Sequence, residues 1–185
     1  DKAGTSGQSS RMTRKVPRVS VMLGVGLLLP ALALAQLEES ALEFIQDGKD
    51  GRHFVASKSG AKFTPWGFNY DHDRSNRLLE TYWIKEWGSV VEDFAEMKQL
   101  GANVVRVHPQ LSRFMKSARE PNREALEQFA RLVALAEKTG LYLDVTGLGC
   151  YDKQETPNWY NQLNEPERWD VQARFWTAMA ATCSN

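Results

Sequence analysis

From residue 63 to residue 183, the hydrophobic and polar positions follow two periods, one typical of strands and one typical of helices. Short apolar runs predict strands at residues 63–70, 104–108 and 141–146. Each run is followed by a segment in which apolar residues recur every three or four positions, at residues 89–101, 122–140 and 168–183. Alternating strands and helices indicate parallel βαβ units, and therefore an α/β fold.

The residues that flank the helices support their predicted limits. Residues 89–92 (SVVE) have the spacing of a capping box, and Gly101 is expected to end that helix. Asn122 is expected to cap the second helix, and Gly140 to end it. The apolar stripe of this helix consists of Leu126, Phe129, Leu132, Val133 and Ala136. The apolar face of the third helix is expected to carry Trp169, Ala173, Trp176 and Ala180.

Two shorter apolar runs precede the first predicted strand. They comprise residues 44–46 (FIQ) and 53–55 (HFV), and they flank a Gly-containing turn at residues 47–51. This pattern predicts a small β-hairpin before the βα units.

The spacing of the strands limits how many βα units the chain can contain. They begin near residues 64, 104 and 141, at intervals of 40 and 37 residues, so a fourth strand is expected near residues 180–185. Three βα units cannot close an eight-stranded barrel, which typically takes about 250 residues. An open three-stranded sheet would leave unpaired edges. We therefore expect residues 36–185 to form the amino-terminal part of a (β/α)8 TIM barrel, truncated before strand four.

The first 35 residues have the pattern of a targeting segment. Arg14, Lys15 and Arg18 precede an apolar run at residues 21–32, and residues 33–35 (ALA) offer a cleavage site. A transmembrane anchor is the alternative, but the run is shorter than the roughly 20 residues that cross a bilayer, and a proline interrupts it. We expect a signal peptide cut after Ala35, and a secreted or periplasmic protein.

The composition is that of an ordinary globular protein, with 42% hydrophobic and 25% charged residues. Lys and Arg together number 23, as do Asp and Glu, so the formal net charge is zero. Nucleic acid is not expected as a partner, because its binders normally show a basic excess or a basic face. Without residues 1–35, 18 basic and 22 acidic residues remain, a net charge of −4. We expect a soluble monomer with no membrane association after signal cleavage.

The two cysteines, Cys150 and Cys183, are not expected to form a disulfide bond. The helix between them, of some 16 residues, would separate them by about 24 Å, whereas a disulfide needs Cα atoms within about 7 Å.

Polar residues gather at the predicted carboxyl ends of the strands, which is where (β/α)8 barrels build their active sites. These residues are Asn69, Tyr70, Asp71, His72 and Asp73 on the first strand, Arg106 and His108 on the second, and Asp144 and Thr146 on the third. Arg106 is expected to point inward and to be buried, and therefore to need an anionic partner. That partner is either a carboxylate from another strand or Asp144, in a purely structural ion pair.

Two groups of residues could contact a ligand. Residues 71–73 (DHD) resemble metal ligands, but consecutive side chains point in alternating directions, so we expect polar rim residues, with His72 as a sugar contact and no metal site. Tyr151, Trp159 and Tyr160 could stack on sugar rings or pack under a loop, and the sequence leaves both alternatives open.

Three stretches resemble glycoside hydrolase family 5, the cellulase and mannanase group of retaining (β/α)8 barrels. They are residues 63–70 (FTPWGFNY), 97–107 (MKQLGANVVRV) and 140–145 (GLYLDV). The resemblance implies hydrolysis of a β-linked glucan or mannan by two carboxylic acids about 5 to 5.5 Å apart. It places the acid/base glutamate after strand four and the nucleophile after strand seven, both beyond this chain, which alone is expected to be inactive. No metal or organic cofactor is implied.

By this resemblance, Arg106 matches the arginine beside the nucleophile, whose ionisation it would support. No catalytic residue is therefore expected within the chain. The substrate-binding residues are expected to be Asn69, His72, Arg106, His108 and Trp159. Thr146 stands where the family often has histidine, which keeps open a second hypothesis, a non-catalytic carbohydrate-binding TIM barrel.

Residues 164–166 (NEP) match the tripeptide that carries the catalytic acid in many glycosidases. There it follows an apolar fourth strand, whereas here it follows a polar and aromatic loop. Asn164 and Glu167 have the spacing of a helix N-cap and its third residue, and Pro166 suits a first turn. We therefore expect this tripeptide to cap the third helix and not to supply the catalytic acid.

Overall fold

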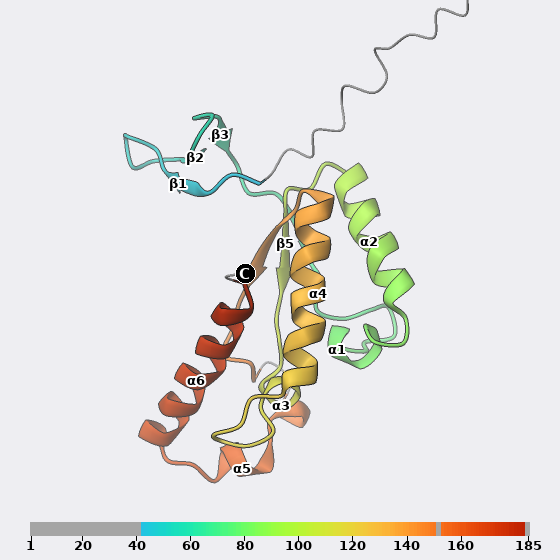
Figure 1. Cartoon of the computed structure of the whole chain (residues 1–185), viewed down its shortest axis with the longest axis vertical. Helices are drawn as coiled ribbons and strands as arrows, with labels where there is room; N and C mark the ends of the chain where they lie inside the picture. The colour runs from blue at the N-terminus through green and yellow to red at the C-terminus, as the bar shows by residue number, and fades with distance from the viewer. Residues whose placement is uncertain (1–41, 151–152, 184–185) are drawn as a thin grey trace, which may run out of the picture. The chain divides into compact units, whose positions relative to one another are not determined.

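The computed structural model describes residues 42–150 and 153–183 (Figure 1). Every described residue belongs to one unit of the chain, Leu37–Asn185. The predicted signal peptide and Tyr151 lie outside the described residues. Within the described ranges, no helix has the length and apolar character needed to cross a membrane.

The described part contains one antiparallel and one parallel sheet. Strands β1 (Ile45–Asp47), β2 (Phe54–Ala56) and β3 (Lys62–Phe63) pair in that order and are antiparallel. The predicted hairpin is thus confirmed, and β3 extends it. Strands β4 (Gly67–Asn69), β5 (Val104–Val107) and β6 (Tyr142–Val145) are parallel, which confirms the βαβ units. The fold is mixed α/β and is compatible with part of a TIM barrel.

The strand predicted over residues 63–70 is wrong as a single element, because it is split between β3 and β4. The side chain of Asn103, 37 residues after Trp66, stabilises this break between the two strands. The backbone N–H of Trp66 donates to Asn103 Oδ1 (2.8 Å), and Asn103 Nδ2 donates to the carbonyl of Thr64 (2.9 Å). These bonds replace the ladder hydrogen bonds, and Pro65 has no N–H to contribute to a ladder.

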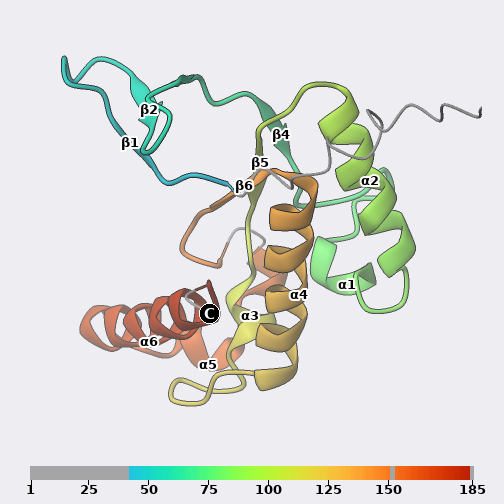
Figure 2. The same ribbon diagram turned by 45° about the horizontal axis from the view of Figure 1, so that its top comes forward.

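Three long helices, α2 (Trp87–Gln99), α4 (Arg123–Thr139) and α6 (Glu165–Cys183), follow the parallel strands, and α4 lies between the other two (Figures 1 and 2). Shorter elements fill the connections: α1 (Leu79–Tyr82), α3 (Leu111–Phe114), η1 (Lys153–Glu155) and α5 (Asn158–Asn161). Val105 and Val107 of β5 are buried with the apolar residues of these helices, whereas Arg106 between them is exposed. One face of the sheet is therefore covered and the other is open.

Helix α2 begins two residues before the predicted capping box, so that prediction is wrong. Its N-cap, Glu86, makes no side-chain cap hydrogen bond, because its carboxylate accepts from Arg77 Nη1 and Nη2 at 2.7 and 2.9 Å. Gly101 follows the end of the helix, as predicted.

Helix α4 lies where the sequence predicts it. Asn122 occupies the N-cap position but makes no cap hydrogen bond, since its Nδ2 donates to the carbonyl of Arg113 (2.8 Å). Gly140 ends the helix in the left-handed conformation at φ 70°, which confirms its predicted role. Phe129, Leu132 and Ala136 are buried, which confirms the centre of the predicted stripe.

Helix α6 begins three residues before the predicted Arg168, and its predicted face is wrong. The buried residues are Val171, Gln172, Phe175 and Met179, whereas Trp169 is 57% exposed. Apolar residues lie on two faces of this helix, but Phe175 and Met179 offer more area to bury than Ala173 and Ala180. Both cysteines are free, as expected.

Candidate functional site

Three polar residues form one row across the parallel sheet, near the carboxyl ends of its strands. Asn69 pairs in register with Arg106, and Arg106 with Asp144. Arg106 Nη1 donates to Asn69 Oδ1 at 3.3 Å, and Arg106 Nε lies 4.0 Å from Asp144 Oδ2. The sequence placed these residues at neighbouring strand ends, and the structure brings them together.

The prediction that Arg106 is buried is wrong, because its side chain is 44% exposed on the open face of the sheet. Its anionic partner is Asp144, itself 51% exposed, so the ion pair that the sequence left as an alternative is present. An exposed pair at this distance contributes little stability. The row is therefore a polar surface open to solvent, with an amide, a cation and a carboxylate available to contact hydroxyl groups.

His72 lies in the loop after β4 and is exposed. Its Nδ1 lies 2.8 Å from Asp71 Oδ1, while Asp73 accepts from Arg77 instead. Asp71 and His72 thus contact each other, whereas Asp73 has a separate partner, so the predicted alternation holds only for Asp73. Among residues 42–150 and 153–183, no group of three potential ligands is placed to hold a metal ion.

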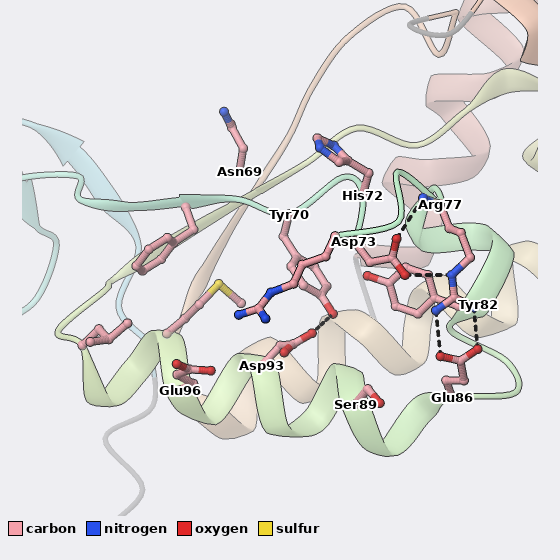
Figure 3. Close-up of a pocket in the computed structure, with 14 residues that line it drawn as sticks. Asn69, Tyr70, His72, Asp73, Arg77, Tyr82, Glu86, Ser89, Asp93 and Glu96 are labelled. Atoms are coloured by element: carbon pink, nitrogen blue, oxygen red, sulfur yellow. Dashed lines mark hydrogen bonds and ion pairs between the residues drawn. The ribbon is translucent and has the colours of Figure 1, made fainter.

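A cavity of about 570 Å³ lies between this loop and α2 (Figure 3). Asp93 and Glu96 line it from α2, and Asn69 and His72 line it from the other side, with side chains that point away from that helix. The cavity and the row therefore share Asn69, whereas Arg106 and Asp144 of the row do not line the cavity. The row, at the carboxyl ends of the strands, is the candidate substrate surface.

Two interactions that sequence reasoning missed hold the loop that lines the cavity. Tyr70 donates its hydroxyl to Asp93 Oδ2 (2.6 Å); burial, followed by this bond, raises the pKa of the phenol. The guanidinium of Arg77 binds both Asp73 (2.7 Å) and Glu86. Asp73 Oδ1 also accepts the backbone N–H of Ser75 and of Arg77, and these bonds lower the pKa of Asp73. The only local signal was the spacing of Asp73 and Ser75, which is typical of an Asx turn.

His108 follows β5 and is half-buried against the loop after β6. Burial, followed by the positive charge of Arg106, lowers the pKa of its imidazole. Gly147 has φ +93°, and any side chain there would collide with the His108 ring. Thr146 lies beside this contact, and its buried hydroxyl oxygen has no hydrogen-bond partner within the part of the chain that the structure describes.

Trp159 lies on α5, partly buried, and its ring meets that of Tyr160 edge-on, at 5.9 Å between centroids. It packs against the hydrophobic core. Tyr160 is buried, and its hydroxyl accepts from Gln172 Nε2 (3.1 Å), so it packs under the loop. A role for Trp159 in substrate binding stays a prediction.

The structure bears out the predicted role of residues 164–166 in capping. Glu167 N–H donates to Asn164 Oδ1 (3.0 Å), and Asn164 N–H donates to Glu167 Oε2 (2.9 Å). This reciprocal pair is a capping box at the start of α6. Glu165 is exposed in the first turn, with its Oε1 3.5 Å from Trp169 Nε1.

The parallel βα units, with polar side chains at the carboxyl ends of their strands, define an α/β fold. No protein-family model and no curated protein sequence matches the chain. Among solved structures it is similar to GH5_18 from Streptomyces cattleya in complex with GlcNAc, with 25% identity and a TM-score of 0.55. It is also similar to a variant of that protein in complex with Manβ1-4GlcNAc, with 24% identity and a TM-score of 0.53.

Each of these two matches covers 66% of this chain and 31% of the solved chain. The chain thus spans about a third of the length of its structural neighbours. The likeness suggests a glycoside hydrolase fold.

Proposed function

We propose that the chain is the amino-terminal part of a secreted, retaining glycoside hydrolase of the family 5 type, which cleaves β-linked polysaccharide. The observation that carries the proposal is the row of Asn69, Arg106 and Asp144. It lies on the open face of a parallel sheet, at the end where (β/α)8 enzymes place their chemistry. Residues 12–35 would direct export, which fits an enzyme that acts on polymers outside the cell.

In this proposal the row binds and orients the sugar, and the two catalytic carboxylic acids belong to a longer protein that contains this chain. One acid would protonate the leaving oxygen and later act as base, while the other attacks the anomeric carbon. Arg106 would lie beside the attacking carboxylate and keep it ionised. The exposure of Arg106 supports this role, because its guanidinium is shared only loosely with Asn69 and Asp144.

The proposed substrates are β-glucans and β-mannans. The structural neighbour at 25% identity binds GlcNAc, so a β-linked amino sugar is a further candidate. We infer that the loops beyond the row decide among these sugars, because the row itself offers only general hydroxyl-binding groups.

Sugar binding by the 185-residue chain tests this proposal. Titration with cellotetraose, mannotetraose and GlcNAc should shift the NMR signals of Asn69, Arg106 and Asp144. Arg106→Ala should weaken binding about tenfold or more, since hydrogen bonds to a charged group contribute roughly 1.5–3 kcal/mol. Arg119→Ala, at an exposed arginine away from the row, is the matched control. Shifts confined to another surface would contradict the assignment, and binding without turnover by the longer protein would favour a non-catalytic carbohydrate-binding barrel.

Glu165→Gln should change the turnover of the longer protein by no more than a few fold. Glu165 is exposed in the first turn of α6, and the capping box that it adjoins uses Asn164 and Glu167. Loss of a general acid typically costs about 10² to 10⁴ in rate. Steady-state kinetics with polymeric substrate distinguishes these cases, and a loss of that larger size would identify Glu165 as the catalytic acid.

A further inference from the structure

Glu80, in the first turn of α1, places a carboxylate against the backbone of another loop. Its Oε1 accepts the backbone N–H of Gln110 at 2.7 Å, across 30 residues of sequence. Gln110 is fully buried. A buried N–H without a partner is costly, so Glu80 satisfies a group that no regular element would satisfy here.

Gln110 and Leu111 make further bonds, one within the loop after β5 and one to the loop after β6. Its side-chain Nε2 donates to the carbonyl of His108 (2.9 Å). The N–H of the next residue, Leu111, donates to the carbonyl of Gly149 in the loop after β6. Hydrogen bonds therefore join the loops that follow β4, β5 and β6, at the edge of the sheet where the row of Asn69, Arg106 and Asp144 lies.

His108 is the polar side chain that these bonds place most directly. Its carbonyl is held by Gln110, and its ring lies against Gly147, where any Cβ would collide with it. His108 also follows Arg106 by two residues, so the backbone that fixes one of these residues constrains the other.

We propose that Glu80 is a positioning residue, which fixes residues 108–111 and thereby holds the His108 imidazole at the border of the substrate surface. This role in sugar binding rests on the proposed function. The positioning itself does not, since it concerns only hydrogen bonds within the chain.

Titratable groups from four neighbouring segments lie around Glu80: α3, η1 and the loops after β4 and β5. Arg113 of α3 and Glu155 of η1, paired at 2.7 Å, influence it with opposite sign, while Asp71 and His108 line the same small cavity. Burial raises the pKa of Glu80, and the hydrogen bond from Gln110 opposes this rise. Glutamine could still accept the same N–H without any charge, so Glu80→Gln separates the hydrogen bond from the charge.

The test uses the 185-residue chain and the ring signals of its three histidines, followed by NMR against pH. In Glu80→Ala, the titration midpoint of His108 should rise toward the ordinary value of about 6.5, because the loosened loop admits water. Exchange of the Gln110 amide hydrogen should become about tenfold faster. Glu80→Gln should restore both readouts. Glu92→Ala, at an exposed glutamate on α2, is the matched control.

A Glu80→Ala chain that is less stable but leaves both the His108 titration and the Gln110 exchange unchanged would overturn the proposal, since Glu80 would then be merely structural. Failure of Glu80→Gln to restore them would also overturn it. If Glu80→Ala does not fold, the wild-type chain decides the question. The Gln110 amide proton should then shift with the titration of a carboxyl group above the ordinary pKa of glutamate, and a shift independent of pH would overturn the proposal. None of these readouts needs a sugar, so they stand apart from failure of the proposed function.

Discussion

Replacing Phe129 with alanine is expected to lower the free energy of unfolding of the chain by about 3–5 kcal/mol. Phe129 lies on α4 with no exposed surface, and its ring meets that of Phe114 edge-on at 6.1 Å. Phe114 in turn contacts Trp83 at 6.0 Å and Phe175 at 6.1 Å. Removal of the Phe129 ring would therefore leave a void at the junction of four segments.

Urea unfolding, followed by circular dichroism, measures this loss. The total stability of a domain is only about 5–15 kcal/mol, so the variant should be visibly less stable, or unfolded at 37 °C. Leu148→Ala is the control, because Leu148 is 55% exposed, and it should change the free energy of unfolding by less than about 0.5 kcal/mol. Equal effects of the two substitutions would show that the core does not form around Phe129.

The parts of the fold that could be predicted from sequence are those with local causes. The apolar period of α4 and the glycine that ends it depend on residues within one helix. The capping box of Asn164 and Glu167 spans only three residues. Such features can be predicted from the residue types and their spacing alone, because all the interacting groups lie within a few residues of one another.

The features that sequence reasoning missed depend on distant partners. The break before β4 depends on Asn103, and the start of α2 follows from the bond between Arg77 and Glu86. The buried face of α6 is selected by packing against α4, to which both faces of the helix offer apolar residues. The hydrophobic periodicity of the sequence does not indicate which distant residues will interact in this way.

The candidate site divides in the same way. Strand alternation places Asn69, Arg106 and Asp144 at neighbouring strand ends, and the observed register then makes them one row. The burial predicted for Arg106 was wrong, because it assumed strands that would face it from across a closed barrel. Glu80 could not be found from sequence, since its partner is a backbone N–H 30 residues away.

If the chain is part of a longer glycoside hydrolase, as proposed, the 185-residue chain alone is expected to hydrolyse no β-glucan or β-mannan above a heat-treated control. Retaining hydrolysis needs two carboxyl groups about 5–5.5 Å apart on opposite sides of the glycosidic bond. The acids near the described strand ends already have other partners. Asp71 contacts His72, Asp73 binds Arg77, and Asp144 faces Arg106 at 4.0 Å.

Loss of a general acid alone typically lowers the rate about 10² to 10⁴ fold, so absence of both acids should leave nothing measurable. The assay needs proof that the chain is folded, for which near-ultraviolet circular dichroism and cooperative unfolding suffice. Asp144→Asn is the decisive variant, because Asp144 is the acid that lies in the row itself. Turnover by the folded chain that disappears in Asp144→Asn would overturn the prediction and place a catalytic carboxylate on β6.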